Sequence, residues 1–81
     1  MDKLYVVATV VHSGASILFG DVILITPDKA HARTVTYHVK EHRPIKGLDY
    51  EKLVAFDDVM YFEREPDKID VFKGSSRLKE K

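Results

Sequence analysis

Three of the four histidines lie in one segment, and their spacing is the first feature of this chain that could do chemistry. They are His31, His38 and His42. If the segment is helical, steps of seven and eleven residues bring all three within about 40° around the helix axis. His38 and His42 then form an i, i+4 pair, a spacing at which two imidazoles can share one metal ion. Because no HExxH motif and no evident third ligand accompany the pair, we predict no metal site.

Nucleophiles and carboxylates give little indication of catalysis. The chain has no cysteine, and its serines occur only in an expected turn, 13–16, and near the C-terminus, without a GxSxG motif. Asp57 and Asp58 are adjacent, so in a strand they point to opposite faces and cannot act as an acid/base pair. The four glycines are dispersed and form no phosphate-binding loop. We therefore expect no enzymatic activity and no cofactor.

Charge sums to zero but is unevenly distributed. Thirteen basic residues balance thirteen acidic ones, so no global field draws the chain to nucleic acid or to a membrane. Basic residues are concentrated between residues 29 and 46, and acidic ones between residues 56 and 70. A local nucleic-acid contact would use the basic 40–46 segment and the basic tail. Its candidate residues are Tyr37, Lys40, Arg43 and Lys46.

Length and composition predict a single folded domain. The 81 residues are 44% hydrophobic and 32% charged, which is typical of a globular protein. We expect the domain to span residues 1–74, with 75–81 as a flexible tail. The apolar runs 4–11 and 17–25 are too short to cross a membrane, and the N-terminal run lacks the net positive charge of a signal peptide. The absence of cysteine favours an intracellular, cytoplasmic protein.

The first half of the chain predicts a β-hairpin. Residues 4–11 and 17–25 are rich in β-branched and aromatic side chains, and 12–16 contains glycine and small polar residues. Gly20 and Asp21 interrupt the second strand, which indicates a bulge or a close backbone approach. Both strands are apolar on both faces, so both faces should be covered.

The segment from Thr26 to Pro44 fits two structures. As a helix over 27–42, it has Thr26 as N-cap, Pro27 at the first helical position and an apolar stripe, with Pro44 beyond its end. The stripe comprises Ala32, Val35 and Val39. As a strand over 33–40, it alternates apolar and polar residues. A strand would leave the outer faces of the hairpin without a cover, so we favour the helix.

The remaining segments complete an α+β fold. Residues 50–55 predict a short helix capped by Asp49, and 58–63 with 68–72 predict a second hairpin. We therefore predict an antiparallel sheet of four strands, with the helix over 27–42 on one face. The alternative is a mainly β fold, either a five-stranded barrel of SH3-like layout or an open meander.

The apolar character of the first hairpin points to protein association. It exceeds what one helix can cover in a short chain, and an uncovered apolar sheet face commonly marks a protein contact. We predict a small interaction or regulatory module that forms a homodimer or binds another protein. Its candidate interface residues are Tyr5, Val7 and Phe19. The alternative function is that of a nucleic-acid-binding accessory protein.

Overall fold

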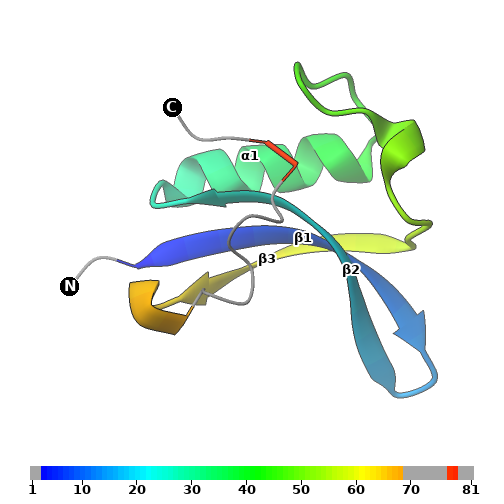
Figure 1. Cartoon of the computed structure of the whole chain (residues 1–81), viewed down its shortest axis with the longest axis horizontal. Helices are drawn as coiled ribbons and strands as arrows, with labels where there is room; N and C mark the ends of the chain where they lie inside the picture. The colour runs from blue at the N-terminus through cyan, green and yellow to red at the C-terminus, as the bar shows by residue number, and fades with distance from the viewer. Residues whose placement is uncertain (1–2, 69–76, 79–81) are drawn as a thin grey trace.

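The computed structural model describes residues 3–68 together with 77 and 78. In this part of the chain, one antiparallel sheet carries a single α-helix on one face (Figure 1). The strand order is β2-β1-β3, so β1 is central. The elements are β1 (Leu4–Ser13), β2 (Ser16–Thr26), α1 (Lys29–Lys40), β3 (Asp58–Arg64) and the short 3₁₀ helices η1 (Tyr50–Lys52) and η2 (Pro66–Lys68). The fold is α+β, as predicted.

The described residues form three strands, where the sequence predicted four. Lys68, the first residue of the expected fourth strand, here ends η2, and residues 69–72 lie outside the described part of the chain. Pro66 begins η2, and its fixed φ and missing N–H favour a 3₁₀ turn after β3 over a continuous ladder. The five-stranded alternative is wrong, because residues 33–40 are helical.

Helix α1 begins two residues later than expected. Its N-cap is Asp28, whose Oδ1 accepts the His31 N–H at 3.2 Å, whereas Thr26 remains the last residue of β2. The Thr26 hydroxyl accepts the Asp28 N–H at 3.1 Å and so fixes the turn between strand and helix. The predicted stripe is confirmed: the buried residues of α1 are Ala32, Val35, Thr36 and Val39.

Helix α1 also ends earlier than expected, at Lys40. His42 has φ 54°, and the His42 and Arg43 N–H groups donate to the carbonyls of Val39 and His38 at 3.1 and 2.9 Å. This is the Schellman arrangement, in which a left-handed residue terminates the helix. The His42 ring stacks with the rings of Tyr50 and Phe56, at centroid distances of 5.2 and 5.5 Å, and these contacts offset the strain of a non-glycine residue there.

The core lies on both sides of the central strand. On the α1 side, Val7 packs with Ile23, Val59 and the buried stripe of the helix. On the far side, Val6 and Val22 pack with Leu4, Ile25 and Phe62. Val6, Ala8 and Val10 are at most 1% exposed. Both faces of β1 are therefore covered between Val6 and Val10.

Strand β2 is irregular at two places. One of them is the irregularity that the sequence predicted at Gly20 and Asp21. The register with β1 shifts between Val7 and Ala8 and again between Ala8 and Val10, where Gly20 and Asp21 together face Thr9. A Cβ on Gly20 would lie 2.7 Å from the Thr9 hydroxyl oxygen. This contact explains why only glycine fits at that position.

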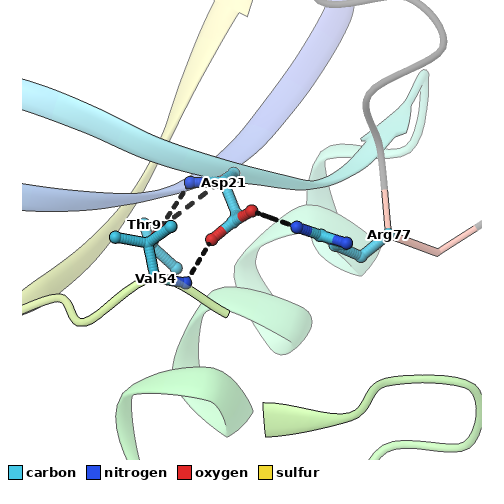
Figure 2. Close-up of polar contacts among 4 residues, drawn as sticks. All are labelled: Thr9, Asp21, Val54 and Arg77. Carbon is cyan, nitrogen blue, oxygen red and sulfur yellow. Dashed lines mark hydrogen bonds and ion pairs between the residues drawn. The ribbon is translucent and has the colours of Figure 1, made fainter. Parts of the chain in front are cut away.

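A hydrogen-bonded network is built on this bulge (Figure 2). The Thr9 hydroxyl accepts the Asp21 N–H at 2.8 Å and donates to the Asp21 carbonyl at 3.4 Å. The Asp21 carboxylate, which is 9% exposed, accepts the Val54 N–H at 2.8 Å through Oδ2 and the Arg77 guanidinium at 2.6 and 3.2 Å through Oδ1. The network therefore joins β1, β2, the segment before β3 and the C-terminal region.

Arg77 and Leu78 are held on the body of the protein. Their N–H groups donate to the Val22 and Ile23 carbonyls at 2.9 and 2.7 Å, and Leu78 packs against the main core. The rest of the tail, 75–76 and 79–81, lies outside the described residues. The flexibility of 75–76 and 79–81 stays a prediction. Arg77 and Leu78, in contrast, cover part of the outer edge of β2.

Gly20→Ala should lower the free energy of unfolding by ~1–3 kcal/mol, because the new methyl group overpacks the Thr9 hydroxyl. Urea denaturation measures the change. In a Thr9→Ala background the same substitution should cost clearly less, since the clashing oxygen is gone. An equal cost in both backgrounds would show that the hydroxyl is not the obstacle.

Asp21→Ala should lower the free energy of unfolding by ~1–3 kcal/mol, because it leaves the Val54 N–H and the Arg77 guanidinium without their acceptor. Asp21→Asn keeps one carbonyl oxygen and should cost less. The exposed Asp67 serves as the control, and Asp67→Ala should have little effect. Similar values for Asp21→Ala and Asp67→Ala in urea denaturation would argue against the network.

Candidate functional site

The three candidate interface residues occupy different environments. Val7 is fully buried beneath α1, so its assignment to an interface is wrong: the sheet face that it occupies is the one the helix covers. Tyr5 is partly buried against the same core, and its ring meets Tyr61 edge-on at 6.5 Å. Phe19 is 52% exposed. Only Phe19 offers a large apolar surface.

Phe19 belongs to a larger apolar surface at the end of the β1–β2 hairpin. Ile17 and Leu18, which the sequence analysis did not single out, are 45% and 56% exposed. Successive residues of a strand face opposite sides, so both sides of the hairpin end are apolar. Figure 1 shows this end projecting away from α1 and the body of the sheet. We call Ile17, Leu18 and Phe19 the hairpin tip.

Local contacts give the hairpin tip a defined shape. Strand β1 ends at Ser13 and β2 begins at Ser16, so a two-residue turn joins them, with Gly14 at φ 61°. The Phe19 ring lies 5.4 Å from that of Phe62, and the Arg64 guanidinium lies 4.5 Å above the Phe62 ring. The tip is therefore ordered on the protein while its outer surface stays exposed.

Asp57 fixes the adjoining part of β1. Its carboxylate accepts the His12 N–H at 2.9 Å and lies 2.8 Å from His12 Nδ1, and its own N–H donates to the Val10 carbonyl at 3.1 Å. The hydrogen bond from the His12 backbone, together with that from the ring, lowers the pKa of Asp57. Asp57 and Asp58 thus have separate partners, since Asp58 pairs with Lys40 at 3.5 Å.

A second surface lies between α1 and β3. It is an open groove of about 580 Å³, which we call the α1–β3 groove. Its lining residues are Ala30, Arg33, Thr34, Thr36, Tyr37, Lys40 and Tyr61. Two cations and two tyrosines thus share one concave surface.

The structure brings together three of the four nucleic-acid candidates. Tyr37 and Lys40 line the α1–β3 groove, and the Arg43 guanidinium lies 5.1 Å from the centre of the Tyr37 ring. The Tyr50 hydroxyl, whose pKa burial raises, donates to the Arg43 carbonyl at 2.6 Å and holds this residue. Lys46 instead lines a different hollow, beside His31, Leu24 and Leu78.

One charged and one aromatic residue of the groove, Arg33 and Tyr61, were not among the candidates from sequence. Arg33 lies four residues before Tyr37 and seven before Lys40, so the helical reading of 27–42 already placed these three on one face. Tyr61 comes from β3, and its position depends on the pairing of β3 with β1 and on the packing of α1 over that pair. No local pattern contains that information.

His38 and His42 do not form the i, i+4 pair that a helix over 27–42 would give. His42 lies beyond the end of α1 in a left-handed conformation, so the i, i+4 relation with His38 is not realised on a helix. Across the described residues, no group of three histidine, aspartate or glutamate side chains is arranged to hold a metal ion.

Comparison of the chain with models of protein families, with curated proteins and with solved structures gave no match. In the described part of the chain, no helix is long and apolar enough to span a membrane.

The Asp57–His12 contact predicts a pH dependence of stability. Because the pKa of Asp57 is lower in the folded than in the unfolded chain, its contribution is fully present above about pH 4 and is lost as the pH falls through the folded value. Urea denaturation should show a constant difference between the wild type and Asp57→Asn above about pH 5. This difference should shrink at lower pH, and a difference independent of pH would contradict the prediction.

Proposed function

We propose that the protein is a small interaction module without catalytic activity, and that it acts through association of two copies of the chain. The observation that carries this proposal is the hairpin tip, where three consecutive large apolar side chains are about half exposed. A contiguous exposed apolar patch on a small folded protein is typical of an interaction surface. Since the chain has no cysteine, we place this module in the cytoplasm.

The position of the tip supports strand pairing. Among the described residues β2 is an edge strand, and the described contacts of Arg77 and Leu78 with its outer edge lie at Val22 and Ile23. Within the described residues, no strand pairs with the outer edge between Ser16 and Gly20. In an edge strand, alternate backbone N–H and C=O groups point outward and can pair with another strand.

The sequence of the tip favours a second copy as the partner. If two β2 strands pair antiparallel about Leu18, each Leu18 faces its counterpart and Ile17 faces the partner's Phe19. No charged residue occurs from Ser13 to Gly20, so no like charges are opposed. In contrast, β3 carries Asp58, Glu63 and Arg64, and charged side chains of this kind protect strand edges from pairing.

Light scattering at micromolar concentration should give twice the 9.3 kDa mass of one chain. Leu18→Lys should give the monomer mass, with a dissociation constant raised by about 100-fold or more, because two ammonium groups would meet in an apolar contact. Since Leu18 is 56% exposed, the variant should keep its fold. Circular dichroism checks this.

The matched control is Val54→Lys. Val54 is an exposed apolar residue, 62% accessible, in the segment before β3. Its backbone N–H contacts Asp21, but it is not part of the outer edge of β2 that the proposed pairing uses, so the variant should remain dimeric. A monomeric wild type, or a dimer that persists unchanged in Leu18→Lys, would contradict the proposal.

A further inference from the structure

The α1–β3 groove combines positive charge with aromatic surface. Arg33 and Lys40 are seven residues apart on α1, about 10 Å along the helix axis. Tyr37 lies between them, is 52% exposed, and is covered on one side by Arg43. Tyr61 of β3 provides a second aromatic side chain in the same groove.

The cations of the groove are available to a ligand. Arg33 has no acidic partner among the described residues. Lys40 contacts Asp58 at 3.5 Å, but both side chains are nearly half exposed, and such pairs are weak in water. Arg43 is 3.8 Å from Glu41, close to the limit for an ion pair. An anion of higher charge density can therefore compete for these groups.

Aromatic rings between cations point to a particular ligand chemistry. An acidic peptide would use the cations but would leave the exposed Tyr37 ring without a specific partner. A nucleotide uses both, because its phosphate pairs with Arg or Lys and its base stacks on an aromatic side chain. A groove of about 580 Å³ is within the range of sites that hold one such unit.

We infer that the α1–β3 groove binds single-stranded nucleic acid, with a base stacked on Tyr37 and flanking phosphates contacted by Arg33 and Lys40. In a duplex the bases are stacked within the helix, so a single strand is the ligand whose bases can reach the tyrosine. The site is separate from the hairpin tip, and its occupancy does not depend on the proposed association.

Fluorescence anisotropy with a labelled, mixed-sequence DNA strand of about ten nucleotides tests the inference at ~50 mM salt. Tyr37→Ala should weaken binding about 5- to 150-fold, the range for loss of one stacked base. Arg33→Ala should weaken binding and reduce the slope of log affinity against log salt by about 0.7, the value for one single-strand phosphate contact. Both side chains are exposed, so these variants should keep their fold.

The matched control is Lys46→Ala, which removes a cation of the same basic segment from outside the groove. It should leave affinity nearly unchanged. Thr34→Glu, which adds a negative charge inside the groove, should weaken binding. Leu18→Lys should bind as the wild type does, so a failure of the proposed association would not affect this result.

Several results would overturn the inference. They are absence of binding at low salt, equal losses in Lys46→Ala and Arg33→Ala, and unchanged affinity in Tyr37→Ala. Tighter binding of the matching duplex than of the single strand would also overturn the inference. If polyglutamate competes as effectively as unlabelled single-stranded DNA, the inference is also overturned, because the ligand would then be an acidic peptide. A mononucleotide that competes as well as the oligonucleotide, at equal nucleotide concentration, would assign the groove to a free nucleotide instead.

Discussion

The Asp21 carboxylate determines how the parts of this small protein are joined. It lies at an irregular point of β2, where Gly20 allows the backbone to approach the Thr9 hydroxyl, and it accepts the Val54 N–H and the Arg77 guanidinium. A nearly buried carboxylate is costly unless such donors satisfy it. With its donors in place, four segments that are distant in sequence meet at one residue (Figure 2).

The two irregularities of β2 also explain why the hairpin tip is exposed. A bulge increases the local twist and bend of a strand, so the hairpin beyond Gly20 does not continue along the body of the sheet. Helix α1 covers the part of the sheet that precedes this bend, where Val7 is fully buried. Ile17 and Leu18 pair with His12 and Val11, past the bend, and are about half exposed. The end of the hairpin projects away from α1 (Figure 1).

Local patterns in the sequence predicted those features whose causes are local. The helix stripe at Ala32, Val35 and Val39 and the bulge at Gly20 and Asp21 follow from periodicity and from a glycine within a strand. The N-cap was misplaced because Thr26 and Asp28 are both good caps, and the Thr26 hydroxyl is used by the turn instead.

Features that depend on tertiary packing were not predictable in this way. Val7 and Phe19 are both apolar residues of the same hairpin, but Val7 is buried under α1, whereas Phe19 packs on Phe62 on the other side of the sheet and stays half exposed. His42 terminates α1 because Tyr50 and Phe56 stack on its ring, and these residues are eight and fourteen positions away. Tyr61 reaches the α1–β3 groove only through the pairing of β3 with β1.

The two exposed surfaces differ in the forces that act on them. The hairpin tip is uncharged, so contacts there depend on apolar burial, which salts excluded from protein surfaces strengthen. The α1–β3 groove is lined by Arg33 and Lys40, so contacts with phosphate there weaken as salt is added. The tip lies on β2, whereas the groove is lined by α1 and by Tyr61 of β3, so the two surfaces share no residue. Sulfate, a salt of this excluded kind, should therefore strengthen the proposed apolar contact at the tip and weaken the proposed phosphate contact at the groove.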